Sequence, residues 1–209
     1  MRRADCTVVI PVKGTWHAKS RLERNDGGEL ALAMALDTAE AALAAPGVAA
    51  VIVVTAAEVA ARFDELGATI VADPGGGLFS AIEAGLAQVS PAHSSAVLLG
   101  DLPAMRSSEL ESALAAAGEF ERSMVADADG TGTALVTAAS GLAHFLAFGP
   151  GSRAAHAAAG YRELHGDWPG LRRDIDLIEH LGQLELVVGS RTTLLLRSSI
   201  DRRKPGAES

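Results

Sequence analysis

The feature of this sequence that most constrains its fold is an alternation of short apolar runs with longer segments of helical period. Continuous runs of Val, Ile and Leu are typical of strands covered on both faces, and such strands separated by helices predict parallel βαβ units. The strands are expected at residues 7–12, 51–55, 69–71 and 96–99, and the helices at residues 29–45, 57–66, 78–89 and 108–117. For the last helix, Ser107 or Ser108 is predicted as the N-cap, with Glu111 completing a capping box after Ser108.

The second half of the chain predicts a less regular arrangement. Strand patterns at residues 123–126 and 134–137 flank a turn at residues 128–132, and residues 161–164 are a further short strand candidate. Helices are expected at residues 152–159 and 176–184. We therefore predict one α/β domain over residues 1–200, with a mixed, mostly parallel sheet flanked by helices, and an irregular charged tail at residues 201–209.

Composition and charge exclude several classes of protein. The chain has 209 residues and a formal net charge of −8, so nothing general would draw it to nucleic acid. Cys6 is the single cysteine, which excludes an internal disulfide and a zinc site of cysteine pairs, and indicates a reducing cytoplasm. His144, His156 and His165 lack the spacing of metal ligands. The uncharged stretch at residues 41–57 is interrupted by a Pro-Gly pair and is too short for a membrane span, so no membrane segment is expected.

A cluster of basic residues follows the first predicted strand in an otherwise acidic chain. Lys13, Lys19 and Arg21 lie there, and ligands of open α/β sheets bind beyond the carboxyl ends of the strands. Lysine acts as a point charge and arginine as a bidentate fork, so the cluster favours a phosphate-rich ligand over a solvated surface loop. A Walker-type P-loop is excluded because Lys13 and Ala18 occupy the positions of its glycines.

Glycines and aspartates accompany the later predicted elements. Three glycines at residues 75–77 precede a helix, where a backbone without side chains can lie flat against a ligand, or form a plain turn. Asp101 follows the fourth strand, a position suited to a magnesium ion that bridges phosphates, or to a turn. Asp174 and Asp176 precede a predicted helix, for which Asp176 is also a suitable N-cap. Together with the basic loop, these residues predict a site for a nucleotide and Mg²⁺.

Seven short motifs occur in a specific order along the chain. They are IPVK at residues 10–13, KSRL at 19–22, DPGGGL at 73–78, GDLP at 100–103, GTGT at 130–133, FGPGS at 148–152 and DID at 174–176. In their order and spacing they resemble the 2-phospho-L-lactate and phosphoenolpyruvate guanylyltransferases of coenzyme F420 biosynthesis. The resemblance implies a GT-A-like nucleotide-diphospho-sugar transferase fold. It also implies transfer of GMP from GTP to a phosphorylated three-carbon acid, with release of pyrophosphate.

The resemblance further implies a role for each group of motif residues. Mg²⁺ would be bound by Asp101 and Asp174, with Asp176 as the alternative second ligand. The acid would be held by Thr133, Gly149 and Ser152. The catalytic residues would be Lys13, Lys19 and Arg21, facing the triphosphate, together with Asp101. The nucleotide-binding residues would be Pro11, Lys13, Gly75, Gly76, Gly77 and Asp101.

The acid site is also supported by the chemistry of its residues. The turn that ends in Ser152 offers free N–H groups and a hydroxyl to a small anion, and Thr133 adds a second hydroxyl. The alternative is a plain turn with Ser152 as the helix N-cap. Apart from Arg153, the neighbouring residues are apolar, and the GC-rich composition resembles actinobacterial proteins, whose family members are associated with phosphoenolpyruvate. We therefore expect phosphoenolpyruvate to be preferred over 2-phospho-L-lactate, with 3-phospho-D-glycerate last.

One motif departs from the family, and several alternatives stay open. Phe79 and Ser80 stand where the family has Asn and Ala, which leaves base recognition open. The alternative functions are a cytidylyltransferase, a molybdopterin guanylyltransferase or a non-catalytic nucleotide-binding paralogue. The opening PVKG at residues 11–14 differs from the Gly-Gly-x-Ser-x-Arg-Met-Gly loop of molybdopterin guanylyltransferases, and a pure binder needs no pair of carboxylates. Formation of a homo-oligomer through residues 186–196 and functional coupling to a downstream transferase of the pathway also stay open.

Overall fold

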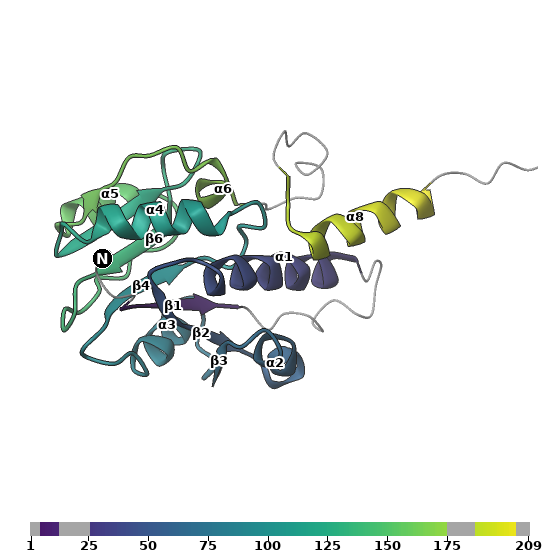
Figure 1. Cartoon of the computed structure of the whole chain (residues 1–209), viewed down its shortest axis with the longest axis horizontal. Helices are drawn as coiled ribbons and strands as arrows, with labels where there is room; N and C mark the ends of the chain where they lie inside the picture. Colours follow the sequence, from purple (N-terminus) through teal and green to yellow (C-terminus); the bar gives the residue numbers. More distant parts are fainter. Residues whose placement is uncertain (1–4, 13–25, 175–186, 204–209) are drawn as a thin grey trace, which may run out of the picture.

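A seven-stranded sheet runs through the centre of the molecule (Figure 1). The structure is a computed structural model, which describes residues 5–12, 26–174 and 187–203. The strands are β1 (Cys6–Pro11), β2 (Val48–Thr55), β3 (Thr69–Ala72), β4 (Ser94–Leu98), β5 (Arg122–Ala126), β6 (Thr133–Ala138) and β7 (Arg162–Glu163). Their order in the sheet is β3-β2-β1-β4-β6-β5-β7, and of these strands β6 is the one that runs antiparallel to its neighbours. The predicted mixed, mostly parallel sheet is therefore confirmed.

Helices cover both faces of the sheet. They are α1 (Asp26–Leu43), α2 (Ala57–Asp64), α3 (Leu78–Leu86), α4 (Ser107–Ala117), α5 (Ser152–Ala158), α6 (Pro169–Arg172) and α8 (Ser190–Arg203). The main core cluster packs α1, α2 and α4 against alternate residues of β1, β2 and β4. The intervening residues of these strands face α3 on the opposite side. Each central strand is buried on both faces, which is why its sequence reads as a continuous apolar run.

The first residue and the cap of α4 differ from the sequence prediction. The helix begins at Ser107, and its capping residue is Arg106, whose backbone N–H donates to the Glu109 carboxylate at 2.9 Å. The predicted box of Ser108 and Glu111 is therefore wrong by two residues. Glu109 is buried and also accepts the N–H of Gly170 at 3.0 Å, so the requirement to partner this carboxylate sets the helix start.

Helix α8 lies beside α1, far from it in sequence (Figure 1). Its first turn is capped by a side chain of α1, because the buried Asp37 carboxylate accepts the backbone N–H groups of Arg191 at 3.2 Å and Thr192 at 2.9 Å. The Arg191 guanidinium also contacts Glu40 at 2.7 Å. Just before the helix, the N–H of Gly189 donates to the carbonyl of Pro103 at 2.8 Å. The helix continues to Arg203, so the first three residues of the expected irregular tail are helical.

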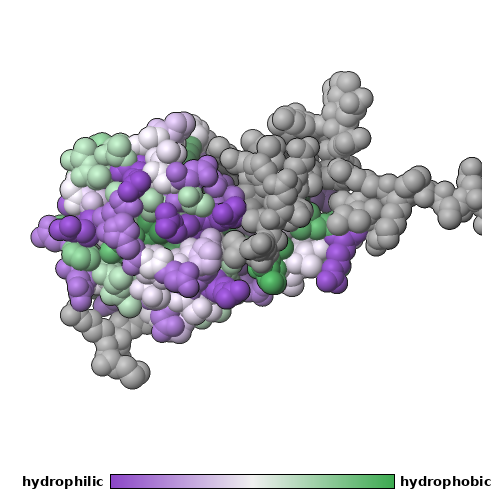
Figure 2. Space-filling view, turned by 90° about the horizontal axis from the view of Figure 1, so that it is seen from above, coloured by the Kyte–Doolittle hydropathy of each residue, from purple (hydrophilic) through white to green (hydrophobic). Residues whose placement is uncertain are grey.

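On the side drawn in Figure 2, the described residues form a mainly hydrophilic surface in which hydrophobic residues are interspersed. In the described part of the chain, no helix has the length and apolar character needed to cross a membrane. This finding agrees with the interpretation of residues 41–57 as a helix end, a turn and a buried strand. Those residues contain the end of α1 and all of β2.

Candidate active site

The pairing of the strands brings most of the predicted site residues that the structure describes to one edge of the sheet. Strand β1 is parallel to β2 and β4, so Pro11 lies at the edge where these strands end. Because β6 is antiparallel to β4, its first residue, Thr133, also lies at this edge. The N–H of Leu99, one residue beyond β4, donates to the carbonyl of Ala134 at 3.2 Å and joins the two strands there. We call this the site edge.

Asp101 leaves the site edge directly beside the end of β1. A Cβ atom added to Gly100 would lie 3.6 Å from the Pro11 carbonyl oxygen, so the Asp101 loop and the end of β1 are neighbours. Asp101 is half-buried. Thr38 of α1 contacts the loop on both sides of Asp101. Its Oγ1 accepts the N–H of Leu102 at 3.2 Å and lies 3.4 Å from the Gly100 carbonyl oxygen. Asp101 is thus carried by a loop that is fixed on both sides.

The glycine loop has a backbone that other residues rarely adopt. The φ angles of Gly75, Gly76 and Gly77 are +77°, +86° and +95°, and all three residues are exposed. The Asp73 carboxylate accepts the N–H of Gly75 at 2.9 Å and shapes the turn. Ser80 lies against this loop, since a Cβ atom on Gly76 would be 3.0 Å from its Oγ. The loop therefore presents bare backbone at the start of α3, as a nucleotide-binding loop requires.

Thr133 is turned into its position by a β-bulge. Between Val125 and Ala126 of β5, the pairing advances from Leu135 to Thr133, so Ala134 is the extra residue. A bulge re-aims the side chains next to it, and Thr133 is the neighbour of Ala134. The loop before Thr133 is held by Asp127, whose carboxylate accepts the N–H of Gly132 at 2.7 Å and that of Thr131 at 3.0 Å.

The buried hydroxyls of Thr133 and Ser152 meet at the site edge. Ser152 Oγ donates to Thr133 Oγ1 at 3.2 Å, and Nδ1 of His156 lies 3.0 Å from the same Thr133 oxygen. The structure therefore brings together Thr133 and Ser152, two of the three residues that the resemblance assigned to the acid. Gly149, the third, lies three residues before Ser152 and has a φ of +124°, and its carbonyl accepts the N–H of Ser152 at 3.0 Å.

One detail of the predicted acid site is wrong, and so is the alternative in which Ser152 is the N-cap. The N–H groups of Ser152 and Arg153 are not free, because they donate to the carbonyls of Gly149 and Thr131 at 3.0 and 3.2 Å. Ser152 is also not the N-cap of α5; Gly151 is, and the Ser152 hydroxyl is directed to Thr133 instead. The Arg153 guanidinium is engaged by Glu163 at 3.0 Å and by the Gly130 carbonyl at 2.9 Å. Of the groups predicted to bind the acid, the hydroxyls of Thr133 and Ser152 therefore fit the prediction better than the N–H groups of Ser152 and Arg153.

The segment that leads to Asp174 is held against the end of β5. The carbonyl of Arg172 accepts the N–H of Ala128 at 2.7 Å, and the Arg172 guanidinium donates to the carbonyls of Ala126 and Asp127 at 3.1 and 3.0 Å. These bonds fix the chain two residues before Asp174 to the end of β5.

In the described ranges, no three Asp, Glu, His or Cys side chains are grouped as a metal site. Four of the predicted site residues lie outside those ranges: Lys13, Lys19, Arg21 and Asp176.

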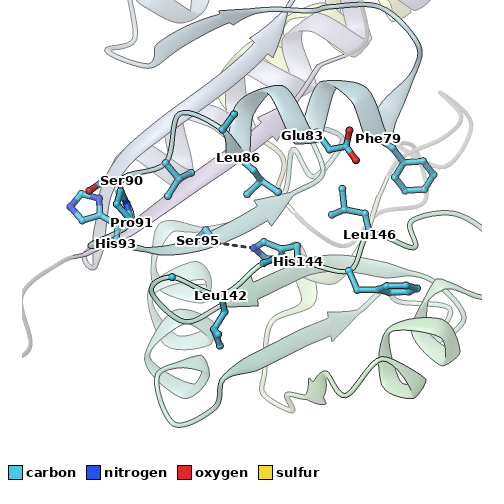
Figure 3. A pocket seen from close by; sticks show the side chains of 15 residues that line it. Phe79, Glu83, Leu86, Ser90, Pro91, His93, Ser95, Leu142, His144 and Leu146 are labelled. Atoms are coloured by element: carbon cyan, nitrogen blue, oxygen red, sulfur yellow. Dashed lines mark hydrogen bonds between the residues drawn. The ribbon is translucent and has the colours of Figure 1, made fainter.

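A separate groove of about 670 Å³ lies between α3 and residues 141–146 (Figure 3). His144 lies on its floor, with Nε2 2.9 Å from the Ser95 hydroxyl and Nδ1 3.2 Å from the Tyr161 hydroxyl. Burial, together with the positive charge of Arg122, lowers the pKa of His144 to about 4, so the ring is neutral at pH 7. Phe79, in the first turn of α3, lies at the end of the groove nearest the glycine loop.

Comparison with known proteins assigns this arrangement to a family. The model of the MobA-like NTP transferase domain matches residues 19–179. A phosphoenolpyruvate guanylyltransferase of Salinispora arenicola is 46% identical, over 90% of this chain and 92% of the relative. A protein of the same name from Streptomyces coelicolor is 48% identical, over 89% of this chain and 93% of the relative. The chain belongs to this guanylyltransferase family. The resemblance seen in the sequence motifs is therefore confirmed. The protein is an enzyme of the nucleotidyltransferase class.

Solved structures confirm the fold of this guanylyltransferase family member. A protein described as a nucleotide-diphospho-sugar transferase from Desulfovibrio desulfuricans covers 96% of both chains with a TM-score of 0.69 and 12% identity. Rv0371c of Mycobacterium tuberculosis, solved in complex with manganese, has a TM-score of 0.50 and 19% identity, over 87% of this chain and 98% of its own. The expected nucleotide-diphospho-sugar transferase fold is therefore present.

Proposed function

We propose that this protein transfers GMP from GTP to phosphoenolpyruvate and releases pyrophosphate. The observation that carries the proposal is the meeting of Thr133 and Ser152 at the same sheet edge as Asp101, in a chain whose relatives at 46% and 48% identity bear this activity in their names. The product, enolpyruvyl-diphospho-5′-guanosine, would serve coenzyme F420 biosynthesis in the cytoplasm. Functional coupling to the pathway transferase that consumes this product belongs to the same proposal.

The reaction needs no protein nucleophile. A phosphate oxygen of the acid attacks the α-phosphorus of GTP in line, the bond from that phosphorus to the bridging oxygen breaks, and pyrophosphate leaves with the electron pair. The acid's phosphate is already ionised at pH 7, so no general base is required. Catalysis then depends on positioning the two anions and on neutralising their charge.

A divalent cation, for which we propose Mg²⁺, would supply part of that neutralisation. Asp101 and Asp174 are suited to hold it, because the Asp101 loop begins at the site edge and the chain before Asp174 is bonded to the end of β5. Mg²⁺ prefers carboxylate oxygens of this kind. Asp176 is the alternative second ligand. The protein contributes the fixed position of the Asp101 loop, held by Thr38, and the fixed start of the Asp174 segment, held by Arg172.

The nucleotide would occupy the opposite side of the site edge from the acid. We propose that the backbone of Pro11 and of the glycine loop at Gly75, Gly76 and Gly77 lies against GTP, while Lys13, Lys19 and Arg21 face its phosphates. The positive φ angles of the glycine loop support this role, because they keep side chains away from the ligand.

The preference for phosphoenolpyruvate is supported by the groups around the hydroxyl pair. Phosphoglycerate carries an extra hydroxyl, and a site that selects it needs a partner for that group. The neighbours Ala134 and Phe148 are buried and apolar. Arg153 is already engaged by Glu163. The side chains of Ala134, Phe148 and Arg153 thus offer no free polar group to an extra hydroxyl of the acid, which favours phosphoenolpyruvate over phosphoglycerate.

A competition assay tests this proposal. Purified protein is incubated with GTP, Mg²⁺ and equal amounts of phosphoenolpyruvate, 2-phospho-L-lactate and 3-phospho-D-glycerate, and the products are resolved by mass. We expect the enolpyruvyl product to predominate, with one pyrophosphate released for each product formed. Predominance of another acid would overturn the substrate assignment. A parallel arm with CTP in place of GTP tests the base, and faster turnover with CTP would indicate a cytidylyltransferase.

A further inference from the structure

His156 is a fully buried histidine directly behind the hydroxyl pair. It lies on α5, four residues after Ser152, so both side chains are on the same face of the helix. The ring is packed between Phe148 and Tyr161, whose ring centroids lie 5.4 and 5.2 Å away. Nothing in the proposed reaction uses His156, although its Nδ1 contacts Thr133.

The contacts of the ring determine which nitrogen carries hydrogen. The backbone N–H of Ala147 donates to Nε2 of His156 at 3.1 Å. A backbone amide donates and never accepts, so Nε2 must be the unprotonated nitrogen. Burial lowers the pKa of His156, which keeps the ring neutral. A neutral imidazole has one N–H, and it is therefore on Nδ1, from which it donates to Thr133 Oγ1.

This donation fixes the polarity of the Thr133 hydroxyl. A hydroxyl has one hydrogen and two lone pairs. One lone pair accepts the His156 N–H, and the other accepts the Ser152 hydroxyl hydrogen at 3.2 Å. The hydrogen of Thr133 is then directed away from both partners. A group that offers only a hydrogen suits an anion, and it gives no acceptor to a hydroxyl on the ligand.

We propose that His156 is a positioning residue, which holds the Thr133 hydroxyl as an obligate hydrogen-bond donor to the acid. This inference rests on the proposed function for the identity of the acid, and on the geometry alone for the hydrogen-bond direction. His156 does not touch the substrate. We expect its effect to be confined to binding of the acid, because the residues proposed to lie against GTP are at the end of β1 and after β3, whereas Thr133 begins β6.

The inference is tested first without any substrate. Long-range ¹H–¹⁵N correlation of the imidazoles, with the His156 signals assigned by their loss in His156→Gln, reports which nitrogen is protonated. We expect the Nδ1–H form. The Nε2–H form would overturn the inference whether or not the protein has the proposed activity. Absence of turnover with every acid in the competition assay would instead remove the proposed function and leave this measurement standing.

Kinetics then test the effect on the acid. In His156→Leu the KM for phosphoenolpyruvate is expected to rise about tenfold or more, the scale of losing one hydrogen bond to a charged group, while the KM for GTP stays near the wild-type value. His156→Gln keeps an amide donor and acceptor and is expected to recover much of the loss. Because His156→Leu also leaves the Ala147 N–H without its partner, its folding is checked by circular dichroism, and the imidazole tautomer measured in the wild-type protein carries the test if it unfolds.

A double-mutant cycle separates positioning from general structural damage. Thr133→Val removes the hydroxyl through which His156 acts, so the double variant Thr133→Val/His156→Leu is expected to have the same acid KM as Thr133→Val alone. Additive losses would show that His156 acts by another route. An equal rise in the KM values of both substrates would show a structural role, and an unchanged acid KM in every His156 variant would also overturn the inference.

Discussion

Thr38 in the middle of α1 and Leu102 in the loop after β4 are joined by a hydrogen bond of 3.2 Å, in which the Leu102 N–H donates to the Thr38 hydroxyl. Both residues are fully buried, and they are 64 positions apart in the sequence. The hydroxyl also donates to the Met34 carbonyl at 2.9 Å. The bond therefore attaches the loop that carries Asp101 to the longest helix of the described chain.

Replacing Thr38 with Val is expected to weaken both stability and metal use. The variant leaves the buried Leu102 N–H without its partner, which costs about 1–3 kcal/mol of unfolding free energy. The Mg²⁺ concentration for half-maximal turnover is expected to rise, because the Asp101 loop loses its support. Denaturant unfolding and a Mg²⁺ titration measure the two effects. Thr38→Ser keeps the hydroxyl and is the control; equal behaviour of the two variants would contradict the role of the bond.

Replacing Asp101 with Asn is expected to reduce turnover by at least about a hundredfold, since loss of a metal-binding carboxylate removes several kcal/mol of charge stabilisation. The melting temperature should stay close to that of the wild-type protein, because the side chain is half-buried and outside the core clusters. Glu83→Gln, an exposed acidic residue of α3, is the matched control. Near-normal activity of Asp101→Asn at millimolar Mg²⁺ would rule out Asp101 as a metal ligand.

Replacing Gly132 with Ala is expected to disturb the loop before Thr133. The added Cβ would overlap with the Asp127 carboxylate, which must move and release the N–H of Gly132. We expect a loss of about 1–3 kcal/mol in unfolding free energy and a higher KM for the acid. Gly118→Ala is the control, because its φ is −62° and its Cβ would meet nothing closer than 3.4 Å. If both variants behave alike, the Asp127 contact has no special role.

The stability of the protein is expected to fall as the pH is lowered from 6.5 to 4. The pKa of His144 is lowered from 6.5 to about 4 in the folded protein, so the unfolded chain binds more protons in this range. The folded state loses up to about 3 kcal/mol from this group as the pH falls across the window, and none above it. His156, with its pKa lowered by burial, acts in the same direction.

Unfolding measured by denaturant at several pH values checks this expectation. His144→Gln should show a shallower loss of stability between pH 6.5 and 4 than the wild-type protein. A wild-type slope in His144→Gln would mean that the buried ring is not the titrating group.

The strands and most helices follow from the sequence because burial on both faces leaves a local signature. Val51 and its neighbours in β2 form one apolar run, and the central sheet could be predicted from such runs alone. The site edge could be predicted in part, because Asp101 and the glycine loop follow recognisable elements. Thr38 and His156 could not, because their roles depend on contacts with residues 64 and 23 positions away. The shifted cap at Arg106 has the same cause, since Gly170, far along the chain, helps to fix Glu109.

The anchoring of the chain on both sides of residues 175–186 has a consequence for metal binding. Arg172 fastens the chain before this segment to β5, and Gly189 fastens it after the segment to Pro103, two residues beyond Asp101. Because both ends of the segment are held near the site edge, the proposed metal ligands Asp101 and Asp174 would be close neighbours before a cation binds. Bringing them together on one ion would then cost less conformational entropy, because folding has already restricted their separation. The hydrogen bonds of Gly189 and of the first turn of α8, which is capped by Asp37, would contribute to metal binding in this way.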